Sequence, residues 1–243
     1  MHPAKKSWHA CCVSSVAQSR AKQLKPWGIK TCKMIWLLLF LFFFDCALTI
    51  CIDPSLNSLE QDNPDLVKYV QDKLLEGPPI FPNTIEEMDL STRDSVLPDF
   101  GSLQGQFGQA PFLEELFKPL VESKNFTRRF FIEAGSFDGI VGSNTLRLEL
   151  DPMWSGLLVE PNPELYKLTK SRSRNVWTFP SCFSTKTHSE IVDFDAAGQI
   201  GGIINKDSRK LPGDGYGYED RKMISLQCFP LYTILLALGK FKE

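Results

Sequence analysis

The stretch FIEAGSFDG, residues 131–139, decides the fold class, because a short apolar run meets a glycine-containing turn within it. Phe130, Phe131 and Ile132 form the run, and the turn begins at Glu133-Ala134-Gly135. This pattern predicts a buried strand that ends in a tight turn. A second run, GLLV at residues 156–159, ends at Glu160 and predicts a second buried strand.

Helical and strand patterns alternate after the first of these strands. Residues 144–150 can form a helix that stops before Pro152, and residues 163–168 open another helix with proline at its first position. Residues 176–179, VWTF, predict a third strand. Strands that alternate with helices at this spacing indicate βαβ units, so we expect an α/β protein with a parallel sheet.

Weaker patterns complete the C-terminal part. Residues 191–194 predict a fourth, irregular strand, and residues 198–217 hold six glycines and predict a long loop. Residues 223–226 predict another strand, which precedes a helix at 229–238.

Two helices and a stem are expected before the first strand. Asn63 and Pro64 can cap a short helix that ends before Gly77. Residues 77–110 are rich in Pro, Gly, Ser and Asp and predict a stem. Apolar residues at 112–121 outline a second helix, which Pro119 should bend or end.

Glycines and acidic strand ends outline a candidate nucleotide site. Gly135 and Gly139 would let the backbone turn tightly and approach a ligand, and the amides that follow would offer donors. Glu160 ends the second strand, where nucleotide-binding sheets hold ribose hydroxyls. Glu133 and Asp138 could share this site, or they could simply cap a turn or a helix.

An apolar run near the N-terminus predicts a membrane span. Residues 1–33 hold basic side chains and no acidic one, and residues 35–52 follow as a run long enough for a helix of about 27 Å. Asp45 costs roughly 2.5–3.5 kcal/mol in that run, but twelve Leu, Ile or Phe residues outweigh it at about 0.3–0.6 kcal/mol each. A cleaved signal peptide and a buried core helix are the alternatives.

The span divides the chain into four parts. We expect a cytosolic tail at 1–34, a signal-anchor helix at 35–52, a lumenal stem at 53–110 and a globular domain at 111–243. Lys and Arg stay on the cytosolic side, so the C-terminal part is expected in the lumen or outside the cell.

The residues expected beyond the membrane include two cysteines and one sequon. Cys182 and Cys228 could pair in an oxidising lumen, or they could remain two buried thiols. Asn125 opens the only N-x-[ST] sequon and is the candidate glycosylation site. No Cys/His spacing predicts a metal site, and the net charge of −2, with no basic stripe, does not favour nucleic acid as a partner.

Four stretches resemble the FkbM-type methyltransferase domain family, and more closely its animal branch of Star-like membrane proteins. The stretches are FIEAGSFDG at 131–139, SNTL at 143–146, WSGLLVEPN at 154–162 and CFPLYT at 228–233. The resemblance implies a Rossmann-like, S-adenosylmethionine methyltransferase-like fold over about residues 111–238. Members of the animal branch also have one N-terminal span and a lumenal domain.

The resemblance implies roles for individual residues. Glu133, Gly135, Asp138 and Gly139 would form the first loop of an S-adenosylmethionine site, and Glu160 would hold the ribose. The family continues with a strand that carries an Asp-x-Glu-Gly motif, which this sequence does not reach before residue 243. We therefore expect a domain that is incomplete at its C-terminus.

Three functions remain open. In the Star-like branch, the implied role is to help membrane cargo such as growth-factor precursors travel from the endoplasmic reticulum to the Golgi apparatus, endosomes or the plasma membrane. An S-adenosylmethionine-dependent O-methyltransferase is the alternative, and a truncated inactive product is the third. His188 is the only histidine beyond the span, and its ordinary role is that of a surface residue. The charged cofactor is made in the cytosol, so we expect non-catalytic binding of the lumenal domains of membrane-bound cargo.

Overall fold

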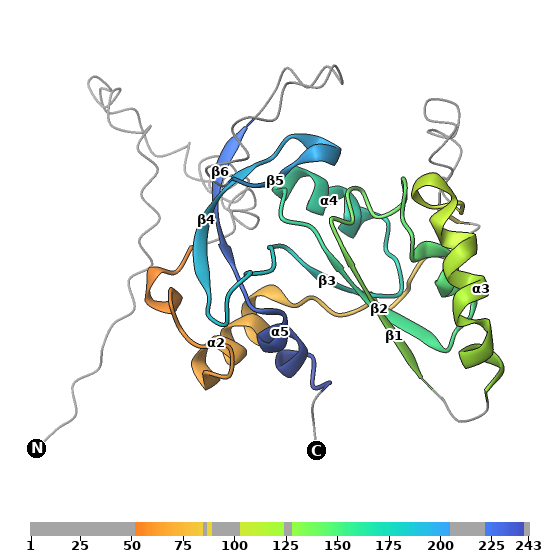
Figure 1. Cartoon of the computed structure of the whole chain (residues 1–243), viewed down its shortest axis with the longest axis horizontal. Coiled ribbons are helices and arrows are strands. Elements are labelled where there is room, and N and C mark those ends of the chain that lie inside the picture. Colours follow the sequence, from red (N-terminus) through yellow and green to blue (C-terminus); the bar gives the residue numbers. More distant parts are fainter. Residues whose placement is uncertain (1–51, 85–86, 89–102, 124–127, 205–221, 241–243) are drawn as a thin grey trace, which may run out of the picture. The chain divides into compact units, whose positions relative to one another are not determined.

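The computed structural model describes residues 52–84, 87–88, 103–123, 128–204 and 222–240 (Figure 1). These residues belong to one compact unit, Leu48–Glu243. Within the described residues, no helix has the length and apolar character needed to cross a membrane. The predicted tail at 1–34 and the predicted span at 35–52 lie outside the described residues, apart from Ile52.

A three-stranded parallel sheet lies at the centre of this unit. Its strands are β1 (Arg129–Ala134), β2 (Trp154–Val159) and β3 (Trp177–Phe179), in the order β1-β2-β3. Phe131 pairs with Gly156, and Val159 pairs with Phe179. The three apolar runs therefore form the expected strands, and the α/β class with a partial Rossmann-like sheet is confirmed.

The two connections within this sheet differ from each other. Helix α4 (Pro163–Ser171) joins β2 to β3, and the Asn162 side chain caps it by accepting hydrogen bonds from the amides of Glu164 and Leu165. Between β1 and β2, the structure has only a 3₁₀ helix at Leu146–Leu150, where the sequence predicted a longer helix at 144–150. Hydrogen bonds from the Asn144 amide and the Thr145 hydroxyl to the Glu133 carboxylate of β1 compete with helical hydrogen bonds there.

A second sheet is antiparallel, which the sequence did not predict. It contains β4 (Glu190–Asp195), β5 (Gly202–Ile203) and β6 (Met223–Cys228) in the order β5-β4-β6. The predicted strands at 191–194 and 223–226 exist, but they do not extend the parallel sheet. Between β4 and β5 there is only a short turn with a 3₁₀ helix at Gly198–Ile200, whereas a parallel crossover needs about a dozen residues or more.

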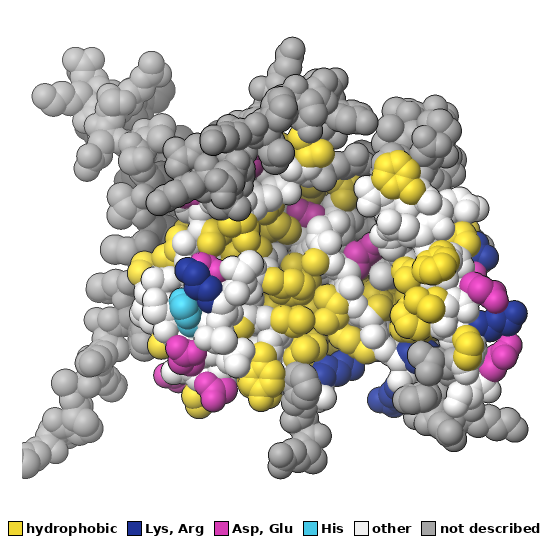
Figure 2. Space-filling view, viewed as in Figure 1, with side chains coloured by type: hydrophobic (Ala, Val, Ile, Leu, Met, Phe, Trp, Pro, Cys, Tyr) yellow, Lys and Arg dark blue, Asp and Glu magenta, His cyan; other side chains and the backbone are white. Residues whose placement is uncertain are grey.

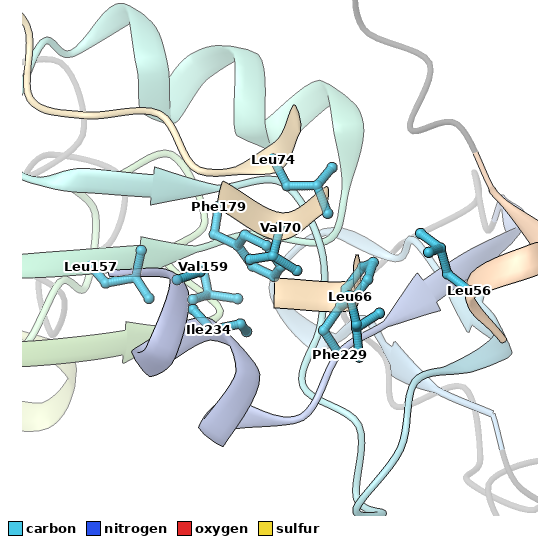
Figure 3. Packing of buried hydrophobic residues seen from close by; sticks show 10 residues of the cluster. Leu56, Leu66, Val70, Leu74, Leu157, Val159, Phe179, Phe229 and Ile234 are labelled. Carbon is cyan, nitrogen blue, oxygen red and sulfur yellow. The ribbon is translucent and has the colours of Figure 1, made fainter. Parts of the chain in front are cut away.

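Helices from both ends of the described part cover one face of the parallel sheet. They are a 3₁₀ helix at Pro54–Leu56, α2 (Pro64–Tyr69), a π turn at Val70–Leu74 and α5 (Leu231–Ala237). Figure 3 shows Leu66 and Val70 packed with Leu157 and Val159 of β2 and with Ile234 of α5. The segment 54–74, which the sequence assigned to the stem, thus contributes to the main core.

Helix α3 (Gln109–Glu122) follows a 3₁₀ helix at Gln106–Gly108 and lies beside the other face. Its Phe117 ring lies 5.6 Å from the Trp154 ring of β2, measured between centroids. Pro119 does not end the helix, which continues for three residues to Glu122. Proline removes only one backbone donor, and a proline this close to the end leaves the earlier turns intact.

Candidate functional site

A cavity of about 380 Å³ lies where β1 and β2 end. Gly135 and Phe137 line it from the loop after β1, and Glu160 lines it from the end of β2. Phe194 and Ile203 of the antiparallel sheet form another part of its wall. In open α/β sheets, ligands bind beyond the carboxyl ends of the strands, so this cavity is the candidate binding site.

Gly135 gives this cavity an open stretch of backbone. Its φ of +75° is in the left-handed region, and no other atom lies within 4 Å of the place where a Cβ would be. The amides of Gly135 and Ser136 both donate to the carbonyl of Val159, so the turn is tied to the end of β2. A ligand could therefore approach the main chain closely at Gly135.

Glu160 is the only ionisable side chain among the described residues that line the cavity. It is 4% exposed, and its two oxygens accept hydrogen bonds from the amides of Phe137 and Asn162 at 2.8 and 2.9 Å. Burial raises the pKa of Glu160 to about 7, although the two amides act in the opposite direction. The carboxyl group thus joins the loop after β1 to the turn after β2.

Glu133 lies outside the cavity lining and stabilises a different segment. Its carboxylate accepts hydrogen bonds from the Ser143 hydroxyl, the Asn144 amide and the Thr145 hydroxyl, at 2.6–2.8 Å. Asn144 in turn accepts a hydrogen bond from the Gln106 amide. Glu133 therefore fixes the loop at 143–145, rather than facing the cavity.

Asp138 and Gly139 also build the loop from within. Asp138 is completely buried, and one of its oxygens accepts hydrogen bonds from the amides of Ile140 and Val141. Its other oxygen accepts a hydrogen bond from Arg172 at 2.9 Å. Gly139 has a φ of +82°, and a Cβ there would lie 3.4 Å from Thr169 of α4. Both residues pack the loop against α4.

Arg174 holds the same loop, and sequence reasoning did not identify it. Its guanidinium donates to the Gly139 carbonyl and the Ser143 and Thr145 hydroxyls, and it pairs with Glu149. The side chain is buried, so its charge depends on these partners. The sequence offered only a weak signal, two arginines in the connection before β3.

Cys182 and Cys228 form a disulfide bond. The bond joins the segment after β3 to the end of β6, and Cys182 lines the cavity. Both residues are buried. The sequence left open whether Cys182 and Cys228 pair or remain two buried thiols. The structure has the bonded pair, and such a bond is stable in an oxidising compartment.

The remaining candidate residues lie elsewhere. His188 pairs with Glu60 through a β-bridge and does not line the cavity. Asn125 lies outside the described residues. Among the residues that the structure does describe, no group of three or more His, Cys, Asp or Glu side chains is arranged to hold a metal ion.

A nucleoside ligand such as that of S-adenosylmethionine would need a cavity of suitable volume and free polar groups on its lining. Its volume is within the range of about 300–1,000 Å³ that is usual for ligand pockets. Each Glu160 oxygen keeps a lone pair for a ribose hydroxyl after it accepts one amide. Gly135 and Glu160 could therefore contact such a ligand, while Glu133, Asp138 and Gly139 would support the loop that surrounds it.

Comparisons of the chain with family models, with curated proteins and with solved structures gave no match. The resemblance to the FkbM-type family therefore depends on the sequence motifs alone. What the structure adds is an α/β fold with a three-stranded parallel sheet and a cavity at the carboxyl ends of its strands.

Proposed function

We propose that the chain is a Star-like, single-pass membrane protein of the early secretory pathway. Its lumenal domain binds membrane-bound cargo and assists transport without transferring a methyl group. The observation that most supports this proposal is that the carboxylates of the sequence motifs are hydrogen-bonded within the protein. Glu133, Asp138 and Glu160 all accept hydrogen bonds from the protein's own groups, so each of them contributes to the fold itself.

The disulfide bond supports the same assignment. Cys182 and Cys228 need an oxidising compartment to stay bonded, and the secretory pathway provides one. The charge asymmetry around residues 35–52 predicts the same side of the membrane for the domain. A cofactor made in the cytosol would need a carrier to reach this compartment.

A transport assay in cells tests the proposal. In cells that lack the full chain, a membrane-anchored growth-factor precursor should stay sensitive to endoglycosidase H for longer, and the wild-type chain should restore its transport. Transport at the same rate with and without the chain, for a panel of such precursors, would contradict the proposal.

A methyltransferase is the second candidate, which the cavity itself favours. Glu160 combines a position at the end of β2 with a pKa of about 7, which suits contact with a nucleoside or proton transfer. S-adenosylmethionine would supply the methyl group, and Gly135 and Glu160 would orient it.

One pair of variants separates the two candidates. Gly202 lines the cavity, and no atom lies within 4 Å of its Cβ position, so Gly202→Phe should fill the cavity and Gly202→Ala should leave it open. If the methyltransferase hypothesis is right, calorimetry should detect saturable binding of S-adenosylmethionine to Gly202→Ala and no binding to Gly202→Phe. If the hypothesis of non-catalytic cargo transport is right, both variants should restore cargo transport equally.

A further inference from the structure

Glu160 differs from the other buried carboxylates around the parallel sheet because no cationic side chain accompanies it. Asp138 pairs with Arg172 at 2.9 Å, and the Glu133 carboxylate lies 3.7 Å from the guanidinium of Arg174. Within the described residues, no lysine or arginine forms an ion pair with Glu160, although it is just as deeply buried. Two backbone amides are its hydrogen-bond donors.

A buried carboxylate without a counter-ion is unfavourable in its charged form. The raised pKa of Glu160 expresses this desolvation. Such a group can become neutral by taking up a proton, or it can keep its charge beside a cation that enters from outside. Glu160 lines the cavity of about 380 Å³, so a cation in that cavity could reach it.

The position of Glu160 does not depend on an edge of the parallel sheet. The residue follows β2, which lies between β1 and β3. Phe194 and Ile203 of the antiparallel sheet form a further part of the cavity wall. Described elements therefore enclose the carboxyl group from several sides.

The composition of the wall favours an organic cation. Phe137, Phe183 and Phe194 are among the lining residues, and phenylalanine rings attract cations through their faces. The only polar side chains in the described lining are those of Gln106 and Glu160. A primary ammonium has three N–H donors that each need an acceptor, whereas a quaternary ammonium has none. An apolar wall with one carboxylate therefore suits the quaternary group better.

A metal ion fits the same cavity poorly. Calcium and magnesium ions take six or more oxygen ligands, and Glu160 is the only carboxylate in the described lining. Figure 2 shows acidic side chains as small patches among hydrophobic and uncharged surface in the middle of one face, with lysine and arginine side chains nearer its margins. A cation that approaches the middle of this face meets little repulsion from visible side chains.

We propose that the cavity beyond β2 binds a small organic cation, a quaternary ammonium on a compact apolar body, with the Glu160 carboxylate as its counter-ion. The lining phenylalanines contact the alkyl groups, and the open backbone at Gly135 leaves room for the rest of the ligand. This binding activity goes beyond cargo transport and does not require it, since it depends on the cavity alone.

Calorimetry of the full chain with choline tests this inference. The chain is held in micelles of an alkyl maltoside, a detergent without an ammonium group. The control ligand is 3,3-dimethylbutan-1-ol, which has the shape of choline but no charge. We expect saturable binding of choline, at least about tenfold tighter than that of the neutral alcohol.

The pH dependence of binding identifies the group that holds the cation. The charge of choline is the same at pH 5 and pH 8, so a change in affinity reports on the protein. Loop 135–142, the turn after β2 and the antiparallel sheet contribute no second titratable side chain to the described lining. Because Glu160 loses its charge as the pH falls, choline should bind at least about tenfold more weakly at pH 5 than at pH 8. The neutral alcohol should bind equally at both.

Two pairs of variants locate the site. Glu160→Gln should abolish the preference for choline over the alcohol. Glu164→Gln removes a nearby carboxylate outside the cavity, whose side chain is 71% exposed, and should keep the preference. Gly202→Phe should fill the cavity and abolish binding, whereas Gly202→Ala should bind choline as the wild type does. Thermal unfolding shows which variants fold, and the Gly202 pair locates the site if Glu160→Gln does not fold.

Three results would overturn the inference. The first is no saturable binding of choline up to about 10 mM at pH 8. The second is equal affinity for choline and the neutral alcohol, which would mean that charge plays no part. The third is unchanged choline binding in a folded Gly202→Phe chain, which would place the ligand elsewhere. None of these results affects the proposed cargo transport, which the assay in cells measures separately.

Discussion

At the residue scale, Glu160 makes the stability of the domain depend on pH. Its carboxyl has a pKa of about 7 in the folded state, whereas the value for an exposed glutamate is 4.5. Between these two pH values the folded state holds a proton that the unfolded state has lost, so stability falls as pH rises. We expect Glu160 to make the domain on the order of 3 kcal/mol less stable at pH 8 than at pH 4.5.

Chemical denaturation of the full chain in detergent, followed by tryptophan fluorescence at pH 5 and pH 8, measures this effect. Glu160→Gln is the comparison, since glutamine does not titrate. The unfolding free energy of the wild type should fall more steeply with pH than that of the variant. Parallel pH profiles would mean that Glu160 titrates as an ordinary exposed carboxyl group.

Gly156 is needed for packing between β1 and β2. A Cβ at this position would lie 2.1 Å from the Phe131 ring, which is buried against Leu148 and Trp154. We expect Gly156→Ala to lower the free energy of unfolding by about 1–3 kcal/mol, because an overpacked ring must move. Thermal unfolding measures the loss, and Gly202→Ala serves as the control because its Cβ would meet nothing within 4 Å.

At the scale of secondary-structure elements, Asn162 connects α4 to the segment that follows β4. Its side-chain oxygen caps α4, and its amide nitrogen donates to the Ala196 carbonyl after β4, at 3.3 Å. We expect Asn162→Ala to cost about 1–2 kcal/mol, since both the cap and the donor are lost. Asn162→Asp keeps the cap and loses only the donor, so it should cost less. Equal losses in denaturation experiments would show that the cap contributes nothing.

The elements differ in how well the sequence predicts them. The runs at 130–132 and 156–159 predict β1 and β2 because an apolar run followed by Gly or Pro is a local signal. Proline at its first position predicts the start of α4 for the same reason. The antiparallel sheet was not predicted, because pairing of β4 with β6 depends on residues far apart in the chain.

At the scale of the whole molecule, the disulfide bond joins the parallel sheet to the antiparallel one. Cys182 and Cys228 are 46 residues apart. Closing a loop of this length should contribute about 4 kcal/mol by restricting the unfolded chain. We expect Cys182→Ser with Cys228→Ser to lower the unfolding free energy by about 2–5 kcal/mol. Dithiothreitol should lower that of the wild type but not that of the double variant.

The orientation in the membrane is tested by the sequon. If the C-terminal part is lumenal, Asn125 should carry a sugar in cells, and Asn125→Gln should remove the mobility shift that peptide N-glycosidase F abolishes. Protease added outside sealed microsomes should leave the C-terminal part intact. An unglycosylated chain whose C-terminal part is digested from outside would contradict the proposed topology.

The sequence by itself determined the α/β class, the three strands of the parallel sheet and the acidic residue at the end of β2. These follow from local patterns, since burial and turn chemistry act on neighbouring residues. Only the tertiary structure decided that Glu160 and Gly135 line the cavity while Glu133 and Asp138 face inward. It also decided that the two cysteines pair and that β4 and β6 form a separate antiparallel sheet, because side-chain direction and strand pairing depend on contacts between residues distant in the chain.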